Sequence, residues 1–167
     1  MTHRRQGFLT MVFVVAMLTT SAGEAVASTG VRAVLDGQPI TLKTAEQLSC
    51  HDFDYPVLTC FRTAGEMETA AATVANARQL EAASSGYIVI FENGDYAGAA
   101  RTVSQDYAYL GDIGFNDRIS SLKSYGATGH FWENAPSGGL LYYFGATSRV
   151  PYVGDTYNDK FSAVYLD

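Results

Sequence analysis

The stretch GFNDRISSLKSYG, residues 114–126, is repeated in a second form, YNDKFSAVYLD, at residues 157–167. Each copy has an aromatic residue, Asn-Asp, two variable residues, Ser, a small residue and then an apolar run typical of a strand. An oxygen-rich loop therefore occurs twice, each time where a strand begins. We interpret this repetition as the mark of a duplicated structural unit.

A second pair of segments repeats in the same order. FENGDYAG, residues 91–98, has an aromatic residue, four residues, a second aromatic residue, one residue and Gly. Forty positions on, FWENAPSG, residues 131–138, repeats this pattern with Pro136 at the position of Tyr96. A duplicated unit of this size is one supersecondary motif that needs its twin to close a core.

Residues 87–167 differ in composition from residues 28–86. They hold ten of the eleven tyrosines, five phenylalanines and the only tryptophan. Short β-branched and aromatic runs alternate there with turn signals such as Asn-Gly and Ser-Gly-Gly. This pattern predicts an all-β sandwich or barrel.

Residues 28–86 predict a small extension in front of the β region. VRAVLDGQPITL predicts a hairpin that turns at Asp36-Gly37. Thr63, with Glu66 three residues later, is a capping-box signature that starts a helix, which Ser84-Ser85-Gly86 would end. The sequence leaves open whether this helix is a lid, a pro-segment or a linker.

The two cysteines, Cys50 and Cys60, both lie in CHDFDYPVLTC. In an exported protein this spacing favours a disulfide that closes a short loop. The spacing does not fit a C-x-x-C site, and the three histidines are scattered, so the sequence gives little support for zinc.

Residues 1–27 have the layout of a signal peptide. A basic start precedes an apolar core at residues 8–18, and an A-x-A site at residues 25–27 predicts cleavage before Ser28. The core is shorter than the roughly 20 residues that cross a bilayer, so we expect a secreted, extracellular protein with no membrane segment after cleavage.

The negative charge of the chain disfavours binding to polyanions. The formal net charge is −6; removing residues 1–27, which carry Arg4, Arg5 and Glu24 and hence +1, leaves −7. An acidic surface disfavours nucleic acids and anionic lipids and is compatible with cations.

Residues 87–167, about half of the chain, resemble the βγ-crystallin family. The aromatic-and-Gly segments are similar to the folded hairpin that opens each Greek key of that family, and the Asn-Asp-x-x-Ser segments are similar to its calcium signature. The resemblance implies an all-β fold in which two Greek-key motifs form a β-sandwich, preceded here by the hairpin and helix of residues 28–86. It also implies a pseudo-twofold axis, with Phe91 and Phe131 in equivalent positions.

The resemblance further implies two calcium sites, each completed across the two repeats. The Asp and a backbone carbonyl of one Asn-Asp segment would meet the Ser and a hairpin carbonyl of the other. The ligands implied are Glu92, Asn116, Asp117, Arg118, Ser120, Trp132, Asn158, Asp159, Lys160 and Ser162, of which Glu92, Arg118, Trp132 and Lys160 act through their backbone carbonyls. Carboxylate, amide, carbonyl and hydroxyl oxygens are the donors that calcium takes.

The two sites are expected to be unequal. Ala163 stands where the family has its final Ser, so we expect weaker binding in the second copy, although this position could serve packing instead of ligation. An ordinary turn is the alternative for each Asn-Asp pair, because Asn, Asp and Ser there commonly hydrogen-bond to the backbone.

The sequence shows no catalytic signature, and we expect no enzyme. It lacks G-x-S-x-G, H-E-x-x-H and a phosphate-binding glycine loop. We expect a secreted calcium-binding protein with a structural, stress or extracellular role. The alternative is a secreted metallopeptidase inhibitor, which would contact an extracellular protease through residues 133–139. That branch of the family keeps disulfides inside its crystallin-like domain, whereas both cysteines lie outside it here.

Overall fold

The structure of the chain is a computed structural model that describes residues 30–79 and 86–167. The expected signal peptide and the expected helix end at Ser84-Ser85 lie outside these residues. Within the described ranges, no helix is both long enough and apolar enough to cross a membrane.

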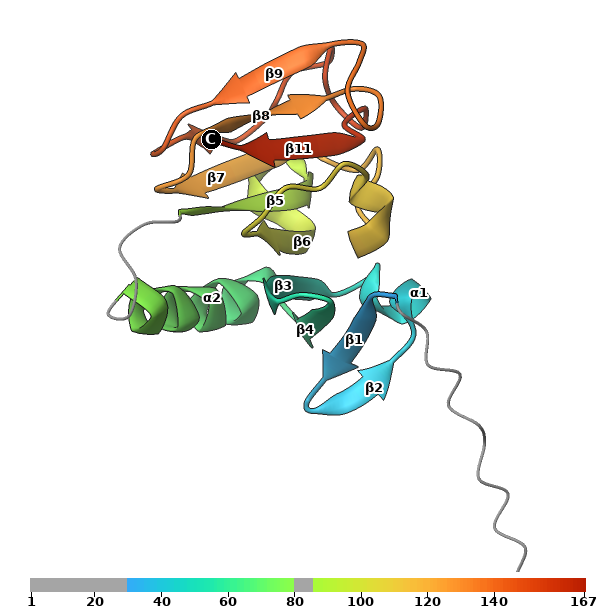
Figure 1. Ribbon diagram of the computed structural model, residues 1–167, viewed down its shortest axis with the longest axis vertical. Helices are drawn as coiled ribbons and strands as arrows, with labels where there is room; N and C mark the ends of the chain where they lie inside the picture. The colour runs from blue at the N-terminus through green and yellow to red at the C-terminus, as the bar shows by residue number, and fades with distance from the viewer. Residues whose placement is uncertain (1–29, 80–85) are drawn as a thin grey trace, which may run out of the picture.

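The described elements are strands with two α-helices and two short 3-10 turns (Figure 1). The strands are β1 (Arg32–Leu35), β2 (Gln38–Ile40), β3 (Ser49–Asp54), β4 (Val57–Phe61), β5 (Tyr87–Asn93), β6 (Ala97–Val103), β7 (Ser121–Tyr125), β8 (Gly129–Trp132), β9 (Leu141–Phe144), β10 (Arg149–Val150) and β11 (Ala163–Leu166). The helices are α1 (Leu42–Ala45) and α2 (Ala64–Gln79), and the 3-10 turns are Gly94–Tyr96 and Leu110–Ile113.

Residues 87–167 form a sandwich of two antiparallel sheets, as predicted. One sheet contains β10-β7-β5-β6 and the other β11-β8-β9. Each repeat also contributes to the sheet of the other: β10 of the second repeat pairs with β7 of the first, and Tyr107 of the first repeat forms a bridge to Val164 in β11. The two repeats are therefore interlocked Greek keys.

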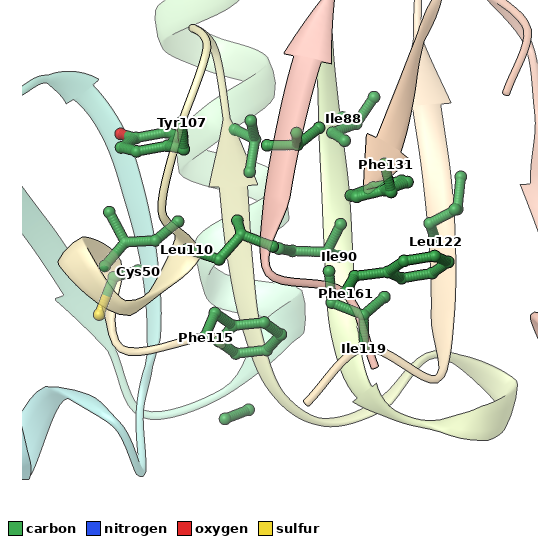
Figure 2. Packing of buried hydrophobic residues seen from close by; sticks show 14 of the residues in the cluster. Cys50, Ile88, Ile90, Tyr107, Leu110, Phe115, Ile119, Leu122, Phe131 and Phe161 are labelled. Atoms are coloured by element: carbon green, nitrogen blue, oxygen red, sulfur yellow. The ribbon is translucent and has the colours of Figure 1, made fainter. Parts of the chain in front are cut away.

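The core lies between the two sheets and is apolar. Ile88, Ile90 and Leu122 from one sheet lie close to Phe131 and Phe161 on the other side (Figure 2). Alternate residues of a strand face opposite sides, so each strand of the sandwich supplies every second residue to this layer. Phe131 and Phe161 stack with ring centroids 4.8 Å apart.

The N-terminal segment extends the first sheet of the sandwich. β3 runs parallel beside β6, with Cys50 opposite Arg101, and β4, β1 and β2 follow to complete an eight-stranded sheet. The predicted hairpin is present between β1 and β2. Asp36 and Gly37 have φ angles of 51° and 75°, and two left-handed residues are what a two-residue hairpin turn needs.

Helix α2 packs on the outer face of this sheet, the side away from the sandwich core. Its buried Met67 and Ala71 lie in one cluster with Tyr87, Val89 and Phe91 of β5. The predicted capping box is present: the Thr63 N–H donates to Glu66 Oε2 (3.1 Å), and the Glu66 N–H donates to Thr63 Oγ1 (3.2 Å). β5 is therefore covered on both faces, which explains its continuous apolar sequence.

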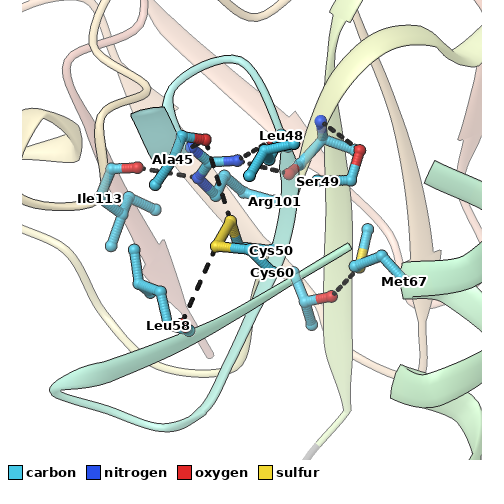
Figure 3. Close-up of a disulfide and its surroundings, with 11 residues drawn as sticks. Ala45, Leu48, Ser49, Cys50, Leu58, Cys60, Met67, Arg101 and Ile113 are labelled. Atoms are coloured by element: carbon cyan, nitrogen blue, oxygen red, sulfur yellow. Dashed lines mark hydrogen bonds between the residues drawn. A yellow bond between two sulfur atoms is a disulfide. The ribbon is translucent and has the colours of Figure 1, made fainter. Parts of the chain in front are cut away.

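The predicted disulfide joins β3 and β4. Cys50 and Cys60 face each other across the two strands, and both side chains are buried (Figure 3). The bond therefore ties β4 to β3, the strand that pairs with β6 of the sandwich.

Arg101 is a completely buried cation at the junction of β3 and β6 (Figure 3). Its guanidinium donates to the backbone carbonyls of Ala45 (2.8 Å) and Leu48 (2.6 Å) in the N-terminal segment and of Ile113 (2.8 Å) in the sandwich. The same group lies 5.1 Å from the ring centre of Phe115. Burial lowers the pKa of Arg101 to about 9, so it stays charged at neutral pH.

A second buried polar contact joins the same two parts. Asp52 of β3 accepts hydrogen bonds from the Ser104 N–H (2.9 Å) and the Tyr107 hydroxyl (2.8 Å). Burial raises the pKa of the Asp52 carboxyl. These contacts make the N-terminal segment a continuous part of the folded unit.

Replacing Arg101 should destabilise the whole unit. Arg101→Leu leaves buried carbonyls without donors, so we expect the free energy of unfolding in urea to fall by about 3–5 kcal/mol. Arg62→Leu is the matched control, because the Arg62–Asp36 pair is exposed, and it should cost less than about 1 kcal/mol. Equal effects of the two substitutions would contradict this role of Arg101.

Candidate metal centre

The two folded hairpins are equivalent at an offset of 41 residues. The Glu92 side chain accepts the N–H of Ala99 (3.2 Å), and the Glu133 side chain accepts the N–H of Leu140 (3.0 Å). The glycine before each donor, Gly98 or Gly139, has a positive φ of 79° or 71°. Each hairpin is thus closed by a glutamate that reaches seven residues forward.

The offset of 41 corrects the expected equivalence of Phe91 and Phe131. The Ser120 N–H donates to the Phe91 carbonyl (3.0 Å), and the Ser162 N–H donates to the Trp132 carbonyl (2.9 Å), so Phe91 corresponds to Trp132. Phe91 packs under α2, whereas Phe131 lies in the core between the sheets. Because successive residues of a strand alternate in direction, a shift of one residue exchanges the two faces.

Each Asn-Asp loop is held by the backbone of the other repeat. The Asp117 N–H donates to the Phe161 carbonyl (3.0 Å), and the Asp159 N–H donates to the Ile119 carbonyl (3.2 Å). Asp117 and Asp159 have φ angles of 53° and 55°, in the left-handed region that Asp and Asn enter more readily than most residues. The loops cross because each donor finds its acceptor just before the Ser of the opposite copy.

The crossing brings each Asp to the Ser of the other repeat. The Ser162 hydroxyl donates to Asp117 Oδ1 (3.1 Å), and Ser120 Oγ lies 3.5 Å from Asp159 Oδ1. The Ser120 hydroxyl also donates to the Glu92 carbonyl (2.7 Å). We call the group of Glu92, Ser120 and Asp159 site 1, and the group around Asp117 and Ser162 site 2.

The hairpin carbonyl of site 2 differs from the one that the sequence implied. Since Glu133 corresponds to Glu92, the counterpart of the Glu92 carbonyl is the Glu133 carbonyl, and the Trp132 carbonyl already accepts the Ser162 N–H. The sequence analysis therefore named Trp132 at the position whose structural counterpart is Glu133. The signal was present, because Glu-Asn stands six residues before a Gly in both hairpins.

The donors of the two loops fit a hard, oxygen-seeking cation. The Asn116 amide donates to Asp117 Oδ2 (2.6 Å) and the Asn158 amide to Asp159 Oδ2 (2.7 Å). The amide oxygens of both Asn residues are buried without a hydrogen-bond partner, which is uncommon in folded proteins. The same unpaired acceptor therefore occurs beside the same carboxylate in both copies.

Comparison with solved structures finds βγ-crystallin domains. One from Ciona intestinalis is 22% identical, with a TM-score of 0.44, and the match covers 48% of this chain and 99% of that one. One from an archaeon is 22% identical, with a TM-score of 0.46 and coverages of 50% and 100%. One from Clostridium beijerinckii is 29% identical, with a TM-score of 0.43 and coverages of 48% and 95%. No protein-family model and no curated protein matches the sequence.

The closed hairpins, the exchanged strands and the crossed Asn-Asp loops define the architecture of the C-terminal half. Residues 87–167 form a β-sandwich of two interlocked Greek keys, and the βγ-crystallin domains above are what this half of the chain is similar to. The eight-stranded sheet, the helix α2 and the disulfide add residues 30–79 to this sandwich as a structured N-terminal part.

Ser121 and Ala163 occupy the same position in the two repeats, each directly after the Ser of its Asn-Asp segment. The Ser121 hydroxyl donates to the Asn93 carbonyl (2.6 Å) and accepts the Tyr96 N–H (3.1 Å), so it holds the first hairpin. Ala163 has no hydroxyl to support the second hairpin. The copies therefore differ in hairpin support, while both keep the Asp and Ser of the candidate sites.

Each site has one carboxylate within its loop. Among residues 30–79 and 86–167, no group of three or more His, Cys, Asp or Glu side chains gathers where it could hold a metal. An ion at site 1 or site 2 would therefore depend on carbonyl, hydroxyl and amide oxygens and on water. These are ligands of calcium rather than of a transition metal.

Arg118 places a positive charge beside site 1. Its guanidinium donates to Glu92 Oε1 at 2.8 Å. This hydrogen bond is the main reason that the pKa of the Glu92 carboxyl lies below its usual value, and the N–H of Ala99 contributes as well. Glu92 is therefore ionised at neutral pH and offsets the charge of Arg118. At the equivalent place in the other loop, Lys160 is exposed.

Proposed function

We propose that this protein is a secreted calcium-binding βγ-crystallin-like protein with a structural, stress or extracellular role. The observation that carries the proposal is the reciprocal pairing of Asp117 with Ser162 and of Asp159 with Ser120. An ordinary turn needs no partner from a second repeat, whereas a shared ion site does. The expected signal peptide and the Cys50–Cys60 disulfide support an extracellular location.

The chain's own residues would hold the ion as follows. In site 1, the Glu92 carbonyl, the Ser120 hydroxyl and the Asp159 carboxylate point to one place, with the Asn158 amide and the Lys160 carbonyl in the same loop. In site 2, the set is Asp117, Ser162 and the Glu133 carbonyl, with Asn116 and the Arg118 carbonyl beside them. Each site contains a carboxylate from one repeat. A bound calcium ion would supply positive charge between that carboxylate and the oxygen ligands of the other repeat.

Calcium should stabilise the protein with modest affinity. One carboxylate per loop predicts a dissociation constant of about 10⁻⁵ to 10⁻³ M, a range that runs from the weakest calcium sensors to extracellular modules. At a hundredfold excess over that constant, linkage adds about 2.7 kcal/mol per site and raises the melting temperature by several degrees. Calorimetric titration and melting curves test this. No heat, together with a melting temperature unmoved by calcium at a hundred times the upper end of that range, would leave both loops as ordinary turns.

The crossed geometry predicts which substitutions act on the same site. Asp117→Ala should remove one of the two binding events, and adding Ser162→Ala should cause no further loss. Adding Ser120→Ala to Asp117→Ala should remove the remaining event, because Ser120 belongs to the other site. Calorimetry of these variants measures the number of sites, and melting without calcium controls for folding. The opposite grouping would show that each loop binds its ion alone.

Metallopeptidase inhibition is the second candidate function. The observation that favours it is the exposure of residues 134–137, at the tip of the second hairpin. An inhibitor needs such a projecting segment to reach an active site. Assay of the protein against a panel of extracellular metallopeptidases separates the two functions: we expect no inhibition, and micromolar or tighter inhibition that is lost on changing residues 134–137 would favour the inhibitor.

A further inference from the structure

Arg118 connects three parts of the molecule. Its guanidinium donates to the Gly114 carbonyl (2.8 Å) in its own loop, to the Glu46 carbonyl (2.9 Å) at the end of α1, and to Glu92 Oε1 (2.8 Å) in the first hairpin. It also lies 5.2 Å from the ring centre of Phe115. The side chain is about one-fifth exposed, so these contacts are partly shielded from water.

The same residue touches both candidate metal sites. Along the chain it follows Asp117 directly, so its position in the loop sets where the carboxylate of site 2 stands. Through its side chain it holds Glu92, whose carbonyl meets Ser120 in site 1. A displacement of the Arg118 guanidinium would therefore move donors of both sites.

The N-terminal segment lies close against this loop. Gly114 has a φ of 68°, and a Cβ atom at this position would come within 2.9 Å of the Glu46 Cγ. The neighbouring carbonyls of Ala45 and Leu48 are held by Arg101. The end of α1 is thus held to the sandwich by two arginines, Arg101 and Arg118, and Arg118 is part of the first Asn-Asp loop.

The second repeat has no such connection. Lys160 occupies the place of Arg118 and Glu133 that of Glu92, and within the described part of the chain neither forms an ion pair. Among residues 30–79 and 86–167, the Glu133 carboxylate accepts only the Leu140 N–H that closes its own hairpin. The duplicated loops are therefore alike in their metal donors and differ in their attachment to the N-terminal segment.

We propose that the N-terminal segment positions the calcium sites through Arg118, and that calcium in turn strengthens the docking of α1 on the sandwich. The inference rests on the proposed calcium binding. Coupling between two events is reciprocal, because any increase in calcium affinity that docking causes must equal the increase in docking that calcium causes. Arg118 is thus a positioning residue: it holds Glu92 and the loop of Asp117, and it does not touch the ion with its side chain.

Charge and position act in opposite directions at Arg118, and a comparison of variants separates them. Removing a positive charge near a cation site favours binding, whereas releasing Glu92 and Glu46 disfavours it. Arg118→Lys keeps the positive charge and loses part of the contacts. Arg118→Gln removes the charge and the contacts together.

The matched control is Arg78→Gln. Arg78 makes the same kinds of contact away from the loops: its guanidinium donates to the Phe53 carbonyl (2.8 Å) and to Asp54 (2.8 Å), and it lies 5.4 Å from the Phe53 ring centre. It joins α2 to β3, so its loss disturbs the N-terminal segment without releasing Glu92 or the Asp117 loop.

The test is calcium titration and hydrogen exchange on the full chain and these variants. We expect Arg118→Gln to weaken calcium binding by about fivefold or more, the lower end of typical coupling between sites, while Arg78→Gln does not. Calcium should slow amide exchange at residues 42–48 of the parent protein and not of Arg118→Gln. Arg118→Lys should restore part of the affinity, because one ammonium can replace some of the three contacts.

Two failures are distinguishable. If the parent protein binds calcium, but Arg118→Gln binds it as tightly as Arg78→Gln and residues 42–48 exchange at the same rate with and without the ion, the coupling is wrong and the proposed function stands. If the parent protein gives neither heat nor a shift in melting temperature with calcium, the proposed function and the coupling both fail. If Arg118→Gln only lowers the stability of the fold, amide exchange should be faster throughout the chain. Calcium should then still slow amide exchange elsewhere in the sandwich.

Discussion

The exchange of loops between the two repeats is the constraint on which the sandwich depends. Each Asn-Asp loop donates its Asp N–H to a carbonyl of the other repeat, next to the Ser that the same Asp approaches. The short strand β10 of the second repeat pairs with β7 of the first, and Tyr107 of the first repeat forms a bridge to Val164 of the second. Neither repeat can satisfy its loop or complete its sheet by itself. The duplication seen in the sequence is therefore a structural requirement, and the two candidate metal sites are a consequence of it.

The N-terminal part covers the edge and the outer face of the first sheet, which the sandwich alone would leave exposed. An unpaired edge strand is open to pairing with other chains, and β3 covers the edge of β6. The outer face of β5 carries Tyr87, Val89 and Phe91, which α2 buries. A buried guanidinium at Arg101 satisfies the backbone carbonyls where the two parts meet, and a buried charge with fixed acceptors specifies one register of docking.

Local features were predictable from the sequence, and long-range ones were not. The turn at Asp36-Gly37, the Thr63–Glu66 capping box and the Cys50–Cys60 bond each depend on residues at most about ten apart, and all three were confirmed. The pairing of β3 with β6 joins residues some fifty positions apart through one buried arginine, which no local pattern indicates. The residue types of the two aromatic-and-Gly segments also favoured an offset of 40 between the hairpins. The true offset of 41 depends on which face of the sheet each aromatic residue occupies, and that is decided by α2 and the core.

The two repeats are equivalent in their loops and unequal in their support. The first has α2 on its outer face, Ser121 inside its hairpin and Arg118 fixed to α1. The second has Ala163 in place of that Ser, and on its outer face His130 and Tyr143 lie among other rings, with Tyr143 70% exposed. Regions with fewer buried contacts open at lower free energy, so we expect the second repeat to be the weaker one. A cation held between an Asp of one repeat and a Ser of the other would therefore attach the weaker repeat to the stronger. Its stabilising effect would appear first in the second hairpin.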